Sequence, residues 1–245
     1  MPTAFATFSE GKCEVFVENR RRKFAGANFR TGTNSSRNLR GRNNAAALFF
    51  EEYAMTHRFA DIAFTNSVKA AQERYGSRAQ NEHLQSDFGP NDQLSQREAS
   101  FIAERDTFYL ATVSESGWPY VQHRGGPVGF LKVLGPNKLA YADFRGNKQL
   151  ISVGNVSNND RCSLILMDYP NRRRLKILGH MQVVEASSVS PDVLEQVETP
   201  GYRARIERVV LIDVAAFDWN CPQHIKQRYT EQEFAEMNSL ATATK

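Results

Sequence analysis

The chain has 245 residues, of which 41% are hydrophobic and 24% charged, the composition of an ordinary globular protein of one or two domains. No run approaches the roughly 20 apolar residues of a membrane-spanning helix, and the N-terminus lacks the order of a secretory signal. Three scattered cysteines are too few for a disulfide framework, so we expect a reducing, cytoplasmic location.

The net charge of +4 comes from the first part of the chain. Residues 1–50 carry nine Lys and Arg against three Glu, so the remaining residues sum to −2. A broad nucleic-acid-binding face is therefore not expected on the folded part. Residues 19–47 are polar and lack an apolar period, and we predict that residues 1–54 form a disordered basic extension. Four interpretations stay open for this extension: a nucleic-acid-binding arm, an organelle transit peptide, no function, or an upstream translation before a natural start at Met55.

Residues 55–106 are predicted to form a helical lead-in to the main domain. Asp61–Tyr75 has a moderate amphipathic period, whereas Gly76–Gln93 is polar and rich in turn residues. Ser95 is followed three residues later by Glu98, which is the order of a capping box. This pair predicts a helix that leads directly into the first strand.

From Thr107 onward the apolar period changes from helical to strand-like. The first predicted feature is a hairpin over Ala111–Gly126, with its turn at Ser116-Gly117. Further predicted elements are strands at Phe130–Leu134, Lys138–Asp143, Arg161–Asp168, Arg174–Val184 and Arg208–Phe217, a short helix at Pro191–Val197, and a terminal helix of about two turns after the capping box of Thr230 and Glu233. Short strands with close turns predict a mainly β, antiparallel barrel domain with peripheral helices, an α+β fold, over residues 107–245.

Three cations are expected near strand ends. Arg124 precedes Gly125-Gly126, where the backbone can lie close to another molecule, and Arg145 and Lys148 flank a predicted short helix at Lys148–Val153. A helix N-terminus with neighbouring cations can bind a phosphate group. The alternative that these are solvated loop charges stays open.

Four ordered strings carry a resemblance to a known family: ATVSESGWPYVQHRGGPVGFLKVL, YADFRGNKQLISVGN, LMDYPNRRRLKILG and DWNCPQHI. With them the chain resembles the pyridoxamine 5′-phosphate oxidase-like family of FMN-binding split barrels, and within it a bacterial subgroup known only as flavin-nucleotide-binding. The resemblance covers most of residues 55–230. It implies a homodimer of antiparallel six-stranded split β-barrels that binds two FMN molecules in clefts at the subunit interface.

The resemblance also implies which residues contact FMN. Arg124 matches an arginine at the flavin phosphate and ribityl chain, and Lys148 matches the phosphate-binding lysine. Asn147 stands where the oxidase has arginine, so phosphate binding is expected to rest on Arg145 or on main-chain N–H groups. The expected cofactor-binding residues are Arg124, Gly125, Gly126, Tyr141, Ala142, Arg145, Asn147, Lys148, Arg174 and Trp219.

The function implied is that of an FMN-dependent oxidoreductase, which passes hydride or electrons between a reduced donor such as NAD(P)H and a small-molecule acceptor. The alternative is a non-catalytic flavin carrier or sensor, or a haem-binding split barrel. The C-terminal Arg/His constellation of the oxidase has no counterpart in Asp218–Ile225, so oxidation of pyridoxamine phosphate itself is not expected. No catalytic side chain is assigned, because the cofactor carries the chemistry.

Three further residues invite a chemical interpretation. Cys221 and His224 form a C-x-x-H pair, but there is no second pair to complete a zinc site, so no metal site is predicted. We expect these residues to belong to a polar lid over the flavin. His123 is interpreted either as a structural residue at the barrel edge or as a proton donor to reduced flavin.

Overall fold

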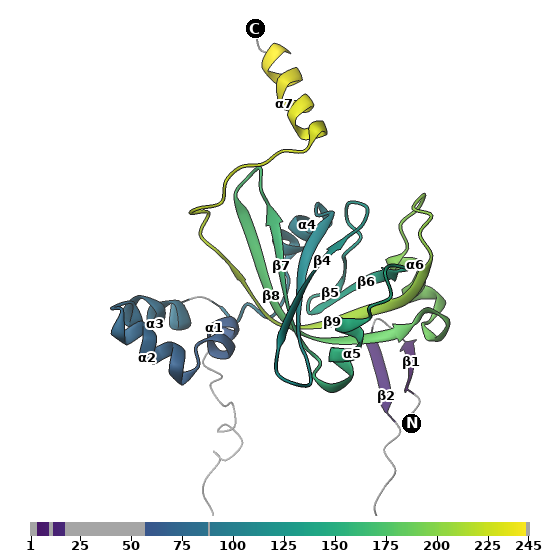
Figure 1. Ribbon diagram of the computed structural model, residues 1–245, viewed down its shortest axis with the longest axis horizontal. Coiled ribbons are helices and arrows are strands. Elements are labelled where there is room, and N and C mark those ends of the chain that lie inside the picture. Colours follow the sequence, from purple (N-terminus) through teal and green to yellow (C-terminus); the bar gives the residue numbers. More distant parts are fainter. Residues whose placement is uncertain (1–3, 10–11, 18–56, 88, 244–245) are drawn as a thin grey trace, which may run out of the picture. The chain divides into compact units, whose positions relative to one another are not determined.

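The computed structural model describes residues 4–9, 12–17, 57–87 and 89–243 (Figure 1). The chain divides into two units, Met1–Ala54 and Met55–Lys245. In the first unit, β1 (Ala4–Ser9) and β2 (Lys12–Val17) pair as antiparallel strands. This hairpin differs from the disorder predicted for the extension, and its alternating aromatic and branched residues have the character of strands. The predicted disorder of residues 18–54 falls outside the described residues.

Four helices precede the sheet of the second unit: α1 (Arg58–Ala63), α2 (Asn66–Arg74), α3 (Arg78–Asp87) and α4 (Gln96–Ala103). The single helix predicted at Asp61–Tyr75 is broken into α1 and α2, because the hydroxyl of Thr65 caps α2 by accepting from the Val68 N–H at 3.4 Å. The prediction that Gly76–Gln93 is turn-rich is wrong for α3. Its sequence has no apolar stripe that would indicate a helix, but Arg, Ala, Gln and Glu are strong helix formers.

The capping box of α4 is confirmed. The Ser95 hydroxyl accepts from the Arg97 N–H at 3.2 Å, and the Glu98 carboxylate accepts in return from the Ser95 N–H at 3.0 Å. These bonds use backbone groups that a helix start otherwise leaves unpaired. Helix α4 therefore begins at a defined residue just before the sheet.

The sheet of the second unit is antiparallel and open, which confirms the split-barrel fold class. Its strands follow the order β4-β3-β7-β8-β9-β6-β5, and the outer strands β4 and β5 are not paired with each other. The count is seven instead of the expected six. The strands are β3 (Thr107–Val113), β4 (Pro119–Gly125), β5 (Lys132–Gly135), β6 (Lys138–Phe144), β7 (Arg161–Asp168), β8 (Arg173–Glu185) and β9 (Ile206–Trp219).

The main hydrophobic core fills the inner face of this sheet. Side chains alternate along the strands, so that Leu164 and Leu166 of β7 and Ile177 of β8 are fully buried. Helix α4 contributes Phe101 and Ile102 to the same cluster. A smaller cluster joins the opposite face of β6 and β9 to helix α6 (Pro191–Val197), which begins with the predicted proline.

The remaining helices lie after β6, β8 and β9 in the chain. Helix α5 (Ile151–Asn158) follows β6, and the 3₁₀ turn η1 (Ala186–Ser188) follows β8. Helix α7 (Glu231–Ala243) starts at the predicted Thr230 capping box but has 13 residues, more than the two turns expected. Among the described residues, no helix is both long and apolar enough to cross a bilayer.

Candidate functional site

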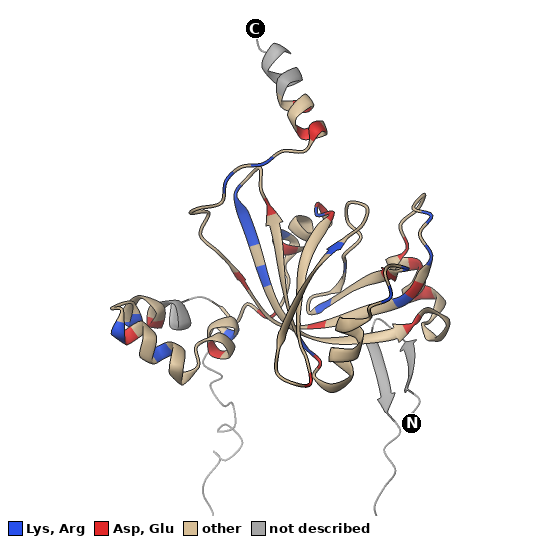
Figure 2. Ribbon diagram, viewed as in Figure 1, with Lys and Arg blue, Asp and Glu red and all other residues tan. Residues whose placement is uncertain are grey.

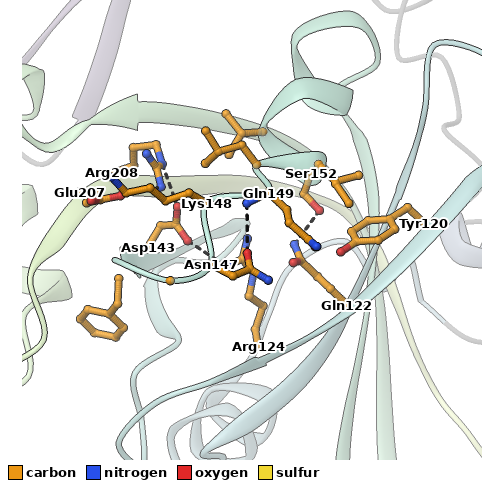
Figure 3. A pocket seen from close by; sticks show the side chains of 15 residues that line it. Tyr120, Gln122, Arg124, Asp143, Asn147, Lys148, Gln149, Ser152, Glu207 and Arg208 are labelled. Atoms are coloured by element: carbon orange, nitrogen blue, oxygen red, sulfur yellow. Dashed lines mark hydrogen bonds and ion pairs between the residues drawn. The ribbon is translucent and has the colours of Figure 1, made fainter.

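A small cavity of about 70 Å³ lies between strand β4, the end of β6, the loop that leads into α5, and the beginning of β9 (Figure 3). Strand β4 supplies Tyr120, Gln122 and Arg124, which alternate with exposed residues and so share the inward face. The hairpin turn that aligns β4 with β3 is the predicted one, with Gly117 at φ 85°. The opening hairpin is thus confirmed, and its second strand lines this cavity.

His123 lies on the other face of β4. Its ring packs edge-on against Tyr109 of β3, with 5.8 Å between ring centroids, and the residue is exposed. A side chain that alternates with Gln122 and Arg124 cannot share their cavity. This placement agrees with the structural interpretation of His123 at the barrel edge.

A buried carboxylate forms the base of the cavity. Asp143 of β6 is 4% exposed, and it accepts from Arg124 Nη1 at 2.8 Å and from Arg208 Nε of β9 at 2.8 Å. Burial alone would lower the pKa of Arg208, but its hydrogen bond to Asp143 and the charge of that carboxylate outweigh burial and raise it. The Arg208 guanidinium group is therefore held as a cation beside the cavity, and both arginines make charge-assisted hydrogen bonds to Asp143.

The loop between β6 and α5 brings a third cation. Lys148 lines the cavity together with Asn147, and the Asn147 side chain accepts from the Gln149 N–H at 3.1 Å. Lys148 and Leu150 have left-handed backbone, with φ of 59° and 54°, and they end the loop just before Ile151. The predicted helix start at Lys148 is therefore wrong, because left-handed residues cannot continue a right-handed helix.

A buried chain of polar side chains fixes α5 against the barrel. Asn155 of α5 donates to the Thr112 hydroxyl at 3.0 Å, and Ser152 lies 3.4 Å from the same hydroxyl and 2.6 Å from the Gln122 amide. Thr112, Ser152 and Asn155 are all buried. Satisfied polar groups of this kind hold one arrangement of their elements, so the first turn of α5 has a defined position at the cavity.

Only part of the predicted cofactor set lies at this cavity. Arg124, Asn147 and Lys148 line it. Arg145 is beside the loop, half-exposed, with its Nε 3.8 Å from a Glu207 carboxylate oxygen. The other predicted residues, Gly125, Gly126, Tyr141, Ala142, Arg174 and Trp219, are not among its lining residues.

The two glycines have a visible packing role. A Cβ atom on Gly126 would lie 2.7 Å from the Phe130 ring, and the Gly126 N–H donates to the Asp106 carbonyl at 3.0 Å. A Cβ atom on Gly125 would lie 3.0 Å from the His123 ring. Residues of the same chain thus lie close to both glycines, and the predicted contact of these glycines with a cofactor stays a prediction.

Tyr141 and Ala142 are buried on opposite faces of β6. Tyr141 belongs to the main core, with the Arg124 guanidinium 5.8 Å from its ring centroid, whereas Ala142 faces α6. The Tyr141 hydroxyl has no hydrogen-bond partner in the described part of the chain, and burial raises its pKa. Tyr141 thus supports the Arg124 side of the cavity from within the core.

Trp219 and Arg174 occupy a different part of the barrel. Trp219 packs edge-on against Phe101, with 4.7 Å between ring centroids, and its indole N–H donates to Glu98 at 2.7 Å. Arg174 belongs to a basic stretch at the beginning of β8 with Arg173 and Lys176 (Figure 2). Their predicted contact with a cofactor stays a prediction, and within one chain the cavity around Arg124 does not include them.

Most residues that line the cavity were not predicted, among them Gln122, Asp143, Ser152 and Arg208. Gln122 could have been found from the period of β4, because it is two residues from Arg124. Arg208 gives no local signal, because it reaches the site through the pairing of β9 with β6. Among the described residues, no group of three or more His, Cys, Asp or Glu is arranged to hold a metal ion.

One family model and several solved structures are similar to this chain. Residues 94–215 match a family model described as pyridoxamine 5′-phosphate oxidase. No curated protein matches the chain. Similar solved structures include an FMN-binding protein from Syntrophomonas wolfei, at 10% identity and TM-score 0.41 over 63% of this chain and 97% of that one. HupZ from Group A Streptococcus matches at 13% identity and TM-score 0.42, over 56% and 99% of the two chains. A protein of Clostridium acetobutylicum related to general stress protein 26 matches at 13% identity and TM-score 0.37, over 56% and 94%.

Proposed function

The chain belongs to the pyridoxamine 5′-phosphate oxidase-like family of split barrels, and from this premise we propose that it is an FMN-binding flavoprotein that works as an oxidoreductase. Its electron donor would be a reduced nucleotide such as NAD(P)H, and its acceptor a small molecule. The observation that carries the proposal is the cavity formed by Arg124, Lys148 and Arg208.

The charges of this cavity suit a phosphate group. Arg124, Lys148 and Arg208 come from three different elements, and they face two carboxylates, Asp143 and Glu207. Lys148 has no ion-pair partner in the part of the chain that the structure describes. A phosphate dianion would supply that partner, and it would accept from the guanidinium N–H groups that Asp143 leaves unused.

The size of the cavity indicates how FMN would lie. Pockets that enclose a whole small molecule measure about 300–1,000 Å³, whereas this one holds about 70 Å³. It is large enough for a phosphate group only, so the ribityl chain and ring would extend outside it. A second surface is then needed to cover the ring.

We assign that surface to a second copy of the chain. The outer face of β3 and β4 presents apolar side chains to solvent, with Val121 61% exposed and Tyr109 38% exposed. Exposed apolar patches of this kind often mark interfaces. A homodimer would bury this face and place each FMN between two subunits.

Bound FMN would supply hydride and electron transfer at its ring. The chain's own residues would bind and orient it. Arg124, Lys148 and Arg208 would hold the phosphate, and the uncapped first turn of α5 would direct main-chain N–H groups toward it. No side chain of the described site is assigned a proton-transfer step.

The first experiment is purification of the untagged protein, with absorbance spectroscopy and mass spectrometry of any released small molecule. The proposal expects a yellow protein that bleaches on reduction and releases FMN. A sharp Soret band would indicate that the protein binds haem and not FMN. Turnover of NADPH with an artificial acceptor would support an enzyme, and its absence in an FMN-loaded protein would indicate a carrier or sensor.

The second experiment removes the phosphate contacts. The double variant Arg124→Ala/Lys148→Ala should weaken FMN binding about a hundredfold or more, because two charge-assisted contacts are lost. Arg161→Ala/Lys226→Ala is the matched control, since both residues are exposed and outside the cavity. Equal FMN affinity in the two double variants would disprove the site.

A further inference from the structure

Asp143 occupies an unusual place between two arginines. Each of its carboxylate oxygens accepts from a different guanidinium group, Oδ1 from Arg124 and Oδ2 from Arg208, both at 2.8 Å. The side chains of Arg124 and Arg208 are 21% and 12% exposed, and that of Asp143 is 4% exposed. One buried carboxylate thus fixes two largely buried cations.

The two ion pairs differ in topology. Asp143 and Arg208 are cross-strand neighbours in the pairing of β6 with β9. Arg124 is on β4, an outer strand in the order β4-β3-β7-β8-β9-β6-β5, whereas β6 lies next to the opposite outer strand, β5. The contact between Arg124 and Asp143 therefore bridges the opening of the barrel, where no backbone hydrogen bonds align the strands.

Arg124 has a second support on its own strand. When the Gln122 carboxamide oxygen faces Arg124, as the surrounding donors require, it accepts from Arg124 Nη2 at 2.9 Å and from Nε at 3.3 Å. The same oxygen accepts from the Ser152 hydroxyl at 2.6 Å. A guanidinium group has five N–H donors in one plane. Asp143 and Gln122 use three of them and leave two for a ligand.

From this geometry we propose that Asp143 is a positioning residue for phosphate recognition. It does not touch the ligand. It holds Arg124 and Arg208 in one orientation across the open side of the barrel, so that their free N–H groups converge on the phosphate of FMN. This inference rests on the proposed function, and it identifies the residue that sets the affinity for the phosphorylated form of the flavin.

Removal of the Asp143 carboxylate has two opposing effects on the affinity for phosphate. The direction of the measured change therefore shows which effect is larger. A carboxylate near the site repels phosphate, so its removal would strengthen binding if charge alone mattered. A long arginine side chain loses much rotamer freedom when it binds, and a partner that has already fixed it removes that cost. The proposal states that the second effect is the larger one at Asp143.

The experiment compares the affinity for FMN with that for riboflavin, which lacks the phosphate, by quenching of flavin fluorescence. Asp143→Asn should weaken FMN binding about tenfold to a hundredfold, the range expected for loss of one charge-assisted hydrogen bond. Riboflavin binding should stay within about twofold, because a residue that acts only through the phosphate site has no contact with the rest of the flavin. Asp213→Asn, at an exposed ion pair with Lys138 on β6 and β9, is the control and should change neither affinity.

A second variant separates position from charge. Asp143→Glu keeps the negative charge but moves the carboxylate by one methylene group, so it should also lower the ratio of FMN to riboflavin affinity. If Asp143→Asn does not fold, the FMN and riboflavin affinities of Asp143→Glu can be measured in its place.

Each outcome has a defined meaning. A folded Asp143 variant with an unchanged or increased FMN preference overturns the positioning role but leaves the proposed function intact. A loss of FMN and riboflavin affinity together overturns it as well, since that result indicates general damage to the site. A wild-type protein that binds FMN no better than riboflavin refutes the phosphate site itself, and with it both proposals.

Discussion

Replacement of Glu98 by Gln tests how the lead-in helix is attached to the barrel. The Glu98 carboxylate is buried, and it joins the start of α4 to the end of β9. Its Oε2 accepts from the Ser95 N–H at 3.0 Å and from the Ser95 hydroxyl at 2.5 Å, and its Oε1 accepts from the Trp219 indole at 2.7 Å. The Arg97 guanidinium lies 4.6 Å from the centre of the Trp219 ring.

The magnitude follows from the number of acceptors. Gln has one carboxamide oxygen, so either the indole or the Ser95 groups must face its NH₂ group. A hydrogen bond to a charged acceptor contributes about 1.5–3 kcal/mol, and we expect Glu98→Gln to lower the free energy of unfolding by about 2 kcal/mol. For a domain of this size that corresponds to a fall in Tm of about 4–8 °C.

The pH dependence of the stability provides a second test of the Glu98 carboxylate. Burial alone would raise the pKa of Glu98, but the hydrogen bonds from Ser95 and Trp219 outweigh burial and hold it below the ordinary value of 4.5. A carboxylate whose folded pKa is lowered stabilises the protein above its unfolded pKa, and this contribution disappears as the pH falls through the folded pKa. The gap between wild type and Glu98→Gln should therefore be constant near neutral pH and shrink below about 4.5.

The assay is thermal unfolding followed by circular dichroism at pH 7 and at several acid pH values. Glu104→Gln, one residue beyond α4 with a side chain 59% exposed, is the control and should change Tm little at any pH. A Glu98→Gln protein as stable as this control at pH 7 would refute the role of the carboxylate. A difference in Tm between wild type and Glu98→Gln that stays constant at acid pH would show that the charge of Glu98 is not the source of the stabilisation.

Two other predictions use stability and thiol chemistry. Gly129 has φ 74°, and a Cβ atom there would lie 2.9 Å from the last carbonyl oxygen of α4, so Gly129→Ala should destabilise the fold by about 1–3 kcal/mol in chemical denaturation. Gly117→Ala, with φ 85° and open space around it, should cost less, and an equal loss would refute the steric argument. Burial raises the pKa of the Cys162 thiol to about 12, so in a Cys13→Ser background only the exposed Cys221 should react quickly with a thiol reagent. Rapid modification that persists in Cys221→Ser would contradict this burial.

Elements with local signals could be predicted from the sequence. The hairpin of β3 and β4 depends on residue alternation around one turn, and the capping boxes at Ser95 and Thr230 each lie within four residues. Helix α3 was missed because its residues favour helix without forming an apolar stripe, and a search for periodicity overlooks such a segment. The break at Thr65 was missed because a capping hydroxyl inside an apolar period is easily read as part of the helix.

Residues of the candidate site could be predicted from the sequence only within the strings that resemble the family. Arg124 and Lys148 were expected near one phosphate, and the structure brings both to one cavity. The contact between Asp143 and Arg208 spans 65 residues and depends on the register of β9 with β6. The bond between Glu98 and Trp219 spans 121 residues, and no spacing rule relates two positions so far apart.

The two tryptophans of the chain provide optical probes in contrasting surroundings. Trp118, which directly precedes β4 at the end of the turn after β3, is 74% exposed and should emit as an indole in water. Trp219 is enclosed by a carboxylate, a guanidinium group and a phenyl ring, so its emission should differ in wavelength and lifetime. A Trp118→Phe protein would emit from one indole alone, and its fluorescence would report whether α4 is seated on the barrel while the sheet remains folded.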